Sequence, residues 1–196
     1  ADRLSTRKSE DGHLVIASGN VYLTQGDPSS KNVLELRCQA AVVFLGPAPR
    51  KEIASPLTAR LATVPSSPGD PNAPGETITG VYLLDDVVIS RGERTLRGPE
   101  AFYDFTMDRA LIRQPVFRTI QEQRNIPIYV RAEEGRLLSD REMWFRDAQV
   151  STSDFHTPSY ASHAQTVALQ NKTRYDDEGV RVGPLEVHAE MRNTTF

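Results

Sequence analysis

The chain has 196 residues, a length that suits one domain, and only 38% of them are hydrophobic, which favours a thin β structure over a thick α/β core. Its 23 lysine and arginine residues nearly balance its 26 aspartate and glutamate residues, giving a formal net charge of −3. The sequence also has no block of five like charges, and this charge pattern argues against nucleic acid as a partner. No run approaches the roughly 18 apolar residues of a membrane-spanning helix, and the start at Ala1 indicates a removed signal sequence or a trimmed chain.

Two short apolar segments flank the Gly19-Asn20 pair near the start of the chain. Residues 14–17 and 21–25 each have the composition of a strand. Because a Gly-Asn pair is a turn signal, we predict that these two segments pair with each other as a hairpin.

Residues 34–44 carry the clearest strand pattern, in which apolar and polar side chains alternate with a period of two. The pattern predicts that Glu35, Arg37 and Gln39 face solvent. Cys38 is predicted to be a small buried hydrophobe, and as the only cysteine it excludes an intramolecular disulfide. The predicted inner face consists of Leu34, Leu36, Cys38, Ala40, Val42 and Phe44.

A proline-rich stretch over residues 46–75 interrupts the strand pattern and holds seven of the 13 prolines. Its end, 66–74, is predicted to be an exposed loop, and Ser55-Pro56 is typical of a helix start, so a short helix is predicted near 53–63. We interpret 46–75 as an insertion in a single domain over residues 1–196, because the strand template resumes after it. A domain boundary at this place is the alternative.

The rest of the chain reads as a succession of short strands separated by turns, including those at Asp85-Asp86, at 91–93 and at 106–108. This spacing, with no capped helical periodicity outside the insertion, predicts an all-β protein with less than about a tenth helix. The predicted strands lie at 81–83, 87–89, 101–105, 110–112, 126–132, 143–151, 160–169 and 180–191, the last broken at Gly183-Pro184.

One template occurs twice along the chain. Gly19-Asn20-Val21 and Asp85-Asp86-Val87 each begin an apolar strand that is followed by a second, alternating strand, at 34–44 and at 95–105. Tandem units of this kind cannot bury their apolar faces alone, so they favour a stacked β architecture. Such an architecture offers grooves and edges rather than a catalytic cleft.

Residues that could carry chemistry are few and scattered. Asp154, His156, Tyr160 and His163 could act in acid–base catalysis, but their turn-rich context favours a solvated loop. The histidines lack zinc-ligand spacing, and 176–179 is better read as a hairpin turn than as a calcium loop. Trp144, between Met143 and Phe145, is expected either at a rim of the core or in a lipid or partner contact. We therefore expect no enzyme activity, catalytic residue, metal or cofactor.

The order of these motifs resembles that of the OstA-like lipopolysaccharide-transport family. The matching elements are Gly19-Asn20-Val21, the segment Leu83 to Gly92, the segment Glu100 to Asp104, and Pro158-Ser159-Tyr160 with Ala164. The resemblance covers roughly residues 12–45 and 76–170. It implies an open, V-shaped β-jelly roll of tandem antiparallel hairpins whose apolar interior accepts the acyl chains of lipid A.

The same resemblance implies a non-catalytic periplasmic module that carries lipopolysaccharide or a related lipid toward the outer membrane. It implies partners of the same fold, joined edge to edge through terminal strands, and an outer-membrane barrel beyond the strand-like end at 193–196. The alternatives are a carbohydrate-active or carbohydrate-binding jelly roll and a polymerising structural β-solenoid. The predicted lipid groove consists of Val21, Leu23, Leu34, Leu36, Val42, Phe44, Val87, Ile89, Leu96, Phe102, Tyr103 and Ile112.

Overall fold

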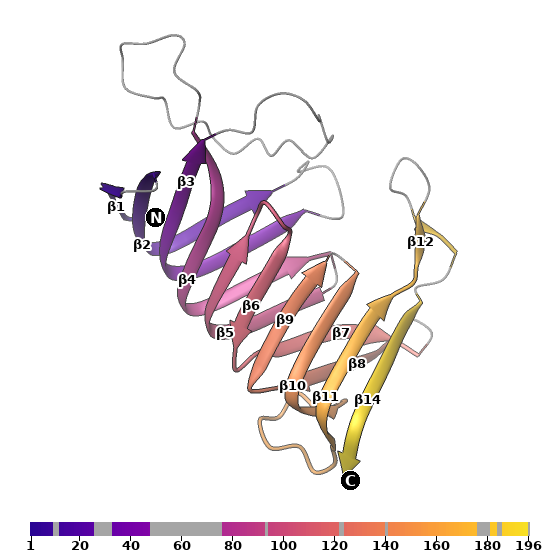
Figure 1. Ribbon diagram of the computed structural model, residues 1–196. Helices are drawn as coiled ribbons and strands as arrows, with labels where there is room; N and C mark the ends of the chain where they lie inside the picture. Colours follow the sequence, from indigo (N-terminus) through magenta and orange to yellow (C-terminus); the bar gives the residue numbers. More distant parts are fainter. Residues whose placement is uncertain are drawn as a thin grey trace.

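The protein is an all-β structure dominated by one antiparallel sheet of 12 strands (Figure 1). The computed structural model describes residues 1–9, 12–25, 33–47, 76–92, 94–121, 124–139, 141–175, 181–183 and 186–195, and this part of the chain contains no helix. The helix predicted near 53–63 and most of the proline-rich stretch lie outside the described residues.

The main sheet follows the order β1-β2-β3-β4-β5-β6-β9-β10-β11-β14, and β7 and β8 complete it by pairing with β5 and β10 and with each other. A separate two-stranded sheet joins β12 to β13. The strands are β1 (Arg3–Ser9), β2 (Gly12–Gln25), β3 (Leu34–Pro47), β4 (Glu76–Arg91), β5 (Arg94–Asp104), β6 (Arg109–Arg113), β7 (Val116–Gln121), β8 (Ile126–Arg131), β9 (Glu134–Ser139), β10 (Glu142–Ser151), β11 (Ser162–Asn171), β12 (Arg174–Tyr175), β13 (Arg181–Val182) and β14 (Val187–Thr195).

The long strands bend in the middle, so the sheet folds over itself into two layers. Residues 100–104 of β5 pair with β6, whereas residues 95–97 pair with β7. In the same way, the first half of β10 pairs with β9 and its last residues pair with β8. We call the part of the sheet that contains β6 and β9 the first layer, and the part that contains β7 and β8 the second layer (Figure 1).

The bends coincide with residues in the left-handed backbone conformation. Because asparagine, aspartate and glycine tolerate positive φ better than other residues, they are well suited to these corners. At the corner of β5, a Cβ on Gly98 would lie 2.7 Å from the carbonyl oxygen of Arg113, so the close approach there requires glycine. The corner residues with positive φ are Gly19 and Asn20 in β2, Asp85 and Asp86 in β4, Gln114 between β6 and β7, Asp147 in β10 and Asn193 in β14.

This geometry corrects the hairpin predicted around Gly19-Asn20. Residues 14–17 and 21–25 do not pair with each other, because both belong to β2 and both pair with β3. The Asp85-Asp86 pair likewise lies inside β4 rather than between two strands. The repeated template therefore marks corners at which a strand passes from one layer to the other. The turns predicted at 91–93 and 106–108 do separate strands, β4 from β5 and β5 from β6.

The corner also changes which side chains of β3 face inward. Leu34, Leu36 and Cys38 are buried as predicted, but beyond the register shift between Arg37 and Ala40 the buried residues are Ala41, Val43 and Leu45. The irregularity inverts the alternation of the strand. The prediction that Ala40, Val42 and Phe44 continue the inner face is therefore wrong.

Replacing Asp86 by valine should test the importance of the corner conformation. Asp86 has a φ of 51° and is exposed, so the change removes no core contact. A β-branched residue is disfavoured at positive φ, and we expect the free energy of unfolding to fall by about 1–2 kcal/mol. Chemical denaturation measures the loss, with Asp86→Gly as the control that should retain or raise stability. Equal stability of the two variants would contradict the assignment.

Candidate functional site: the interior between the layers

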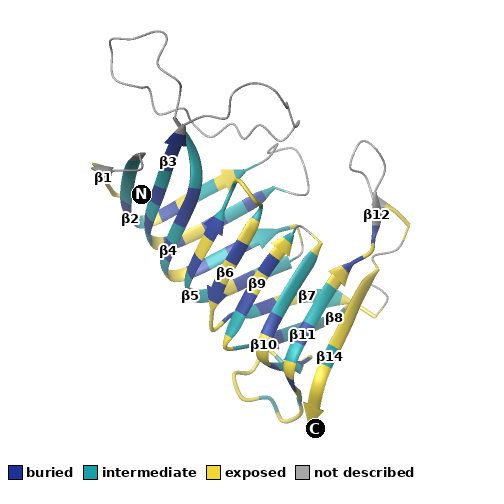
Figure 2. Cartoon of the chain, viewed as in Figure 1, coloured by how far each residue is buried: buried dark blue, intermediate teal, exposed yellow. Residues whose placement is uncertain are grey.

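One row of inward-facing residues crosses the first layer from the first strand of the sheet to the last. Its members are cross-strand neighbours, and most of them are fully buried (Figure 2). The two ends of the row are less buried than its middle, because Leu4 in β1 is 69% exposed and Met191 in β14 is only partly buried. The row consists of Leu4, Ala17, Ala41, Leu83, Ala101, Ile112, Gly135, Phe145, Val167 and Met191.

A matching row crosses the second layer, and the two rows face each other. The rings of Phe117 in β7 and Phe145 in β10 lie 5.7 Å apart between the layers. Side chains of both layers thus form one continuous apolar interior. The second row consists of Leu23, Leu36, Ile89, Leu96, Phe117, Val130 and Val150.

The structure brings nine of the 12 predicted groove residues into this interior. Val42, Phe44 and Phe102 are the exceptions, because they lie on the outer face of the first layer. Phe102 is 38% exposed, and its ring meets that of Phe44 edge-on at 6.1 Å. The nine inner residues are Val21, Leu23, Leu34, Leu36, Val87, Ile89, Leu96, Tyr103 and Ile112.

The middle of the interior is packed rather than open. Tyr103 and Phe145, the largest of the inner side chains, are almost completely buried there. A cavity of about 30 Å³ remains between the layers, enough for one small group. It is lined by Leu34, Ile89, Leu96 and Phe117 of the second layer, by Ala110, Leu137 and Met143 of the first, and by Arg91, Arg94 and Thr95 at one side.

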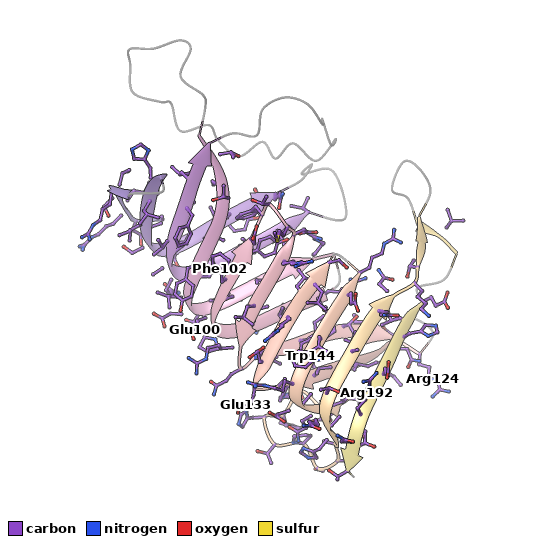
Figure 3. All side chains as sticks on the ribbon, viewed as in Figure 1. Glu100, Phe102, Arg124, Glu133, Trp144 and Arg192 are labelled. Atoms are coloured by element: carbon purple, nitrogen blue, oxygen red, sulfur yellow. The ribbon has the colours of Figure 1, made fainter. Side chains whose placement is uncertain are left out.

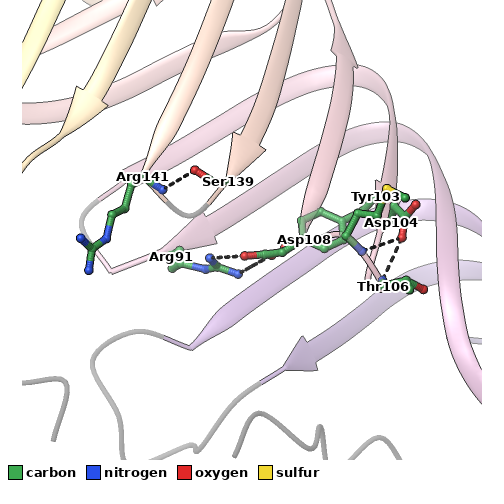
Figure 4. A network of polar contacts seen from close by, with 8 residues as sticks. Arg91, Tyr103, Asp104, Thr106, Asp108, Ser139 and Arg141 are labelled. Carbon is green, nitrogen blue, oxygen red and sulfur yellow. Dashed lines mark hydrogen bonds and ion pairs between the residues drawn. The ribbon is translucent and has the colours of Figure 1, made fainter. Parts of the chain in front are cut away.

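A polar cluster joins the two layers beside this cavity (Figure 4). Arg91 at the end of β4 forms an ion pair with Asp108, with Nη2 and Oδ1 3.1 Å apart, and also donates a hydrogen bond to the hydroxyl of Tyr103 at 3.2 Å. The Tyr103 hydroxyl in turn donates to Asp108. The turn that presents Asp108 is held by Asp104, whose Oδ1 accepts hydrogen bonds from the backbone amides of Thr106 and Met107.

Ionisation in the cluster follows these contacts. Burial raises the pKa of Tyr103, and its hydrogen bond to Asp108 adds to the rise. For Asp108, partial burial favours the neutral acid, but hydrogen bonds from Arg91 and Tyr103 outweigh it and lower the pKa below the ordinary value of 3.8. The cluster is thus neutral Tyr103 with an ionised Arg91–Asp108 pair. We did not predict it from the sequence, since only the turns that hold Arg91 and Asp108 were recognised.

The outer face of the first layer has a different character. Charged side chains pair across strands, with Arg113 Nη1 2.8 Å from Glu100 Oε1, and the Arg136 guanidinium lies 5.4 Å from the centre of the Trp144 ring. Figure 3 shows Glu100, Phe102 and Trp144 on this face. Trp144 thus lies half-buried on the outer face of the first layer, between its cross-strand neighbours Arg136 and Ala168, rather than at a rim, while Phe145 is buried.

The residues considered for acid–base catalysis do not form a site. Asp154, His156 and Tyr160 are exposed in the segment between β10 and β11, where the Tyr160 hydroxyl lies 2.6 Å from Thr152 Oγ1. Within the described ranges, no group of three or more histidine, cysteine, aspartate or glutamate residues could hold a metal ion. The described residues also include no helix that could cross a membrane.

No protein-family model matches the chain, and comparison with curated proteins finds no match either.

Truncation of inner and outer leucines should separate the two faces. Leu36 is 1% exposed in the second-layer row, whereas Leu111 is 44% exposed on the outer face. Leu36→Ala should lower the free energy of unfolding by about 2–5 kcal/mol, because it removes buried contacts and leaves a cavity. Leu111→Ala should cost under about 1 kcal/mol. Denaturant titration compares them, and a larger loss for Leu111→Ala would reverse the assignment of faces.

The Asp108 carboxylate should make stability depend on acidity. Its pKa is lower in the folded protein than the ordinary 3.8, so the stabilisation is fully present above that value and is lost as the pH falls through the folded pKa. Asp108→Asn should therefore reduce the slope of melting temperature against pH below about pH 4. Scanning calorimetry provides the measurement. Asp86→Asn is the control, because Asp86 is an exposed aspartate outside the cluster.

Proposed function

We propose that this chain is a non-catalytic, periplasmic lipid-binding and bridging module of the lipopolysaccharide-export type. The observation that carries the proposal is the first-layer row of ten inward residues, which is apolar throughout and becomes less buried at both ends, at Leu4 and at Met191. If the row served only as a hydrophobic core, covering these ends would make the protein more stable. A protein that passes an acyl chain to a neighbour needs them open.

The two-layer geometry supports the finer fold that the sequence resemblance implies. The layers are continuous through the corners at Asn20, Asp86 and Asp147, and they have separate margins on the opposite side. This is the arrangement expected of a V-shaped β-jelly roll, with the corners at the closed side. In this state the V is filled by its own side chains, so a lipid would displace some of them or part the layers.

The terminal strands support a bridging role. In the described part of the main sheet, β1 and β14 each pair on one side only, with β2 and β11 respectively. Val187 of β14 is 42% exposed although its partner Asn171 is buried, so the inner face of this strand is exposed at this position. A strand added by a second copy or a related module would satisfy the unpaired backbone groups and extend the apolar row.

The apolar interior suits the acyl chain of a lipid. Transfer of an acyl chain from water to an apolar environment gains about 0.8 kcal/mol per CH₂ group, so the burial of about ten methylenes corresponds to micromolar binding. The wall of aliphatic and aromatic side chains imposes no hydrogen-bonding pattern along the chain. The partner lipid is therefore defined by its long acyl chains, as in lipopolysaccharide or lipid A.

Photo-crosslinking at the two open ends tests this function. The sites are Leu4 and Met191, which face inward, with the adjacent outward residues Ser5 and Arg192 as matched controls. The protein is expressed in the periplasm of a lipopolysaccharide-producing host, and mass spectrometry identifies the adducts. We expect lipid adducts at Leu4 and Met191 at least about fivefold above the controls, because acyl chains occupy the apolar face. Equal labelling at all four positions would reject a lipid path.

A polymerising structural β protein is the second candidate, because the uncovered terminal strands favour it as well. It requires edge pairing but no lipid. Purification in a lipid-free form that assembles into filaments, without adducts at Leu4 or Met191, would select this candidate. The carbohydrate-binding alternative gains no support from the site, since Asp154, His156 and Tyr160 are exposed in a connecting segment.

A further inference from the structure

The outer face of the second layer carries a regular row of arginines. Along one cross-strand row, from β3 through β4, β5 and β7 to β8, arginine alternates with valine. Each member is next in sequence to a residue of the second-layer inner row, so its side chain points to the outside. Because neighbouring strands lie about 4.8 Å apart, the arginines recur about every 10 Å. The row consists of Arg37, Val88, Arg97, Val116 and Arg131.

A second outward row lies beside the first and adds a fourth arginine. It consists of Glu35, Ser90, Thr95, Arg118 and Tyr129. We call these two rows together the basic face. With four arginines and one glutamate, the basic face has a formal charge of +3, although the formal charge of the whole chain is −3. The positive charge of this face therefore does not reflect the overall composition.

Local contacts hold the arginines at the two ends of the first row. Arg37 forms an ion pair with Glu35 at 3.1 Å and lies over the Tyr22 ring, 5.1 Å from its centre. Arg131 lies 5.4 Å from the centre of the Tyr129 ring and donates a hydrogen bond to a backbone carbonyl that follows β10. Since a guanidinium already lies over each tyrosine ring, neither ring offers a bare platform on which a base could stack.

The two arginines in the middle of the basic face lack such partners. Arg97 and Arg118 are exposed, and neither side chain forms an ion pair or hydrogen bond within the described ranges. They are diagonal neighbours on β5 and β7, because Arg97 lies opposite Val116, two residues before Arg118. Side chains at such positions lie about 7–8 Å apart. Two like charges at this separation repel each other, and an anionic partner would relieve the repulsion.

The outer face of the first layer treats its arginines differently. Arg113 pairs with Glu100 at 2.8 Å, and Arg136 and Arg146 share Glu134 at 2.6 and 3.3 Å. These arginines are neutralised by carboxylates on the same face. The contrast between the two faces shows that the unpaired charge of Arg97 and Arg118 is a property of the basic face rather than of the sheet as a whole.

We propose that the basic face docks this protein on an anionic membrane surface, with the arginines at the level of the lipid phosphates. This inference goes beyond the proposed function, because no acyl chain has to enter the protein and the interior can stay packed. The arginines lie in two rows over β3 to β8, so they form a two-dimensional array that a plane of negative charge can meet simultaneously. Each arginine close to an anionic bilayer strengthens binding by about fivefold.

The side chains between the arginines favour a bilayer over a polymeric anion. Val88 and Val116 separate the arginines of the first row and are partly buried, and a valine side chain makes no hydrogen bonds. Recognition of a nucleic acid strand uses stacking rings or polar groups between its basic residues. A bilayer interface accepts apolar groups next to basic ones, because headgroups and the upper parts of acyl chains adjoin there.

Sedimentation with lipid vesicles tests the proposal. One set of vesicles contains phosphatidylcholine alone, and the other contains equal amounts of phosphatidylcholine and phosphatidylglycerol with the same acyl chains. The variants are Arg97→Gln, Arg118→Gln, the double glutamine variant, and a double lysine variant that retains the charge. The matched control is Arg109→Gln, which removes an exposed arginine from the outer face of the first layer. Circular dichroism with melting curves checks that each variant is folded.

We expect the native protein to partition onto the anionic vesicles at least about tenfold more strongly than onto the neutral ones, and added salt should weaken this binding. Each single glutamine variant should lower the partition coefficient about fivefold, and the double variant about 25-fold. The double lysine variant should retain most of the binding. Arg109→Gln should change the partition coefficient by less than about twofold, because its charge lies on the opposite side of the molecule.

Three results overturn the membrane-docking inference. They are equal partition onto both kinds of vesicle, native binding by the double glutamine variant, and a loss in Arg109→Gln as large as that in Arg97→Gln. Polyphosphate, added at the same concentration of anionic groups as the vesicles, should leave most of the protein on them. Complete displacement would identify a soluble polyanion as the partner and also overturn the inference. The proposed function is judged separately, by the lipid adducts at Leu4 and Met191.

Discussion

The structure depends on the ability of a β-strand to turn a corner without ending. At residues such as Asn20, Asp85 and Asp147, the backbone enters the left-handed region, and one strand then serves two layers. An asparagine or aspartate side chain, whose carbonyl or carboxyl group can interact with the nearby backbone, lowers the energetic cost of this conformation. Without these corners the same strands would form a flat sheet with an exposed apolar face, and the interior between the two layers would not exist.

The corners explain both the success and the errors of prediction from the sequence. Alternation and turn signals indicated an all-β protein, and the repeated Gly-Asn-Val and Asp-Asp-Val elements indicated a repeated structural device. The sequence alone does not distinguish a hairpin turn from a mid-strand corner, because a local Gly-Asn or Asp-Asp pair has the same composition in both. The hairpin predicted from these pairs is therefore wrong. Val42 and Phe44 were then assigned to the wrong face, since a register shift is a property of two paired strands and leaves no trace in one.

The inner residues that precede the shift, Leu34 and Leu36, were predicted well because burial there follows the simple period of two. The pairing of Arg91 with Asp108 could not be predicted from its separation in sequence. It arises only because β5 crosses from the second layer to the first between these residues. The crossing places Asp108 at the margin of the first layer, facing Arg91 at the margin of the second. Long-range polar contacts of this kind require the topology to be known.

The evenness of the first-layer row has a consequence for motion along it. From Ala17 to Val167 the row presents hydrocarbon at each strand, apart from Gly135, which adds no polar side chain. A hydrocarbon moving from strand to strand exchanges one dispersion contact for another of similar strength. If the proposed function holds and a lipid displaces the packed side chains, the free-energy profile along the row is nearly level, so the row itself sets no preferred direction. Under the proposed bridging function, direction would then be set at the two ends of the row, by unequal lipid occupancy of modules added beside Leu4 and Met191.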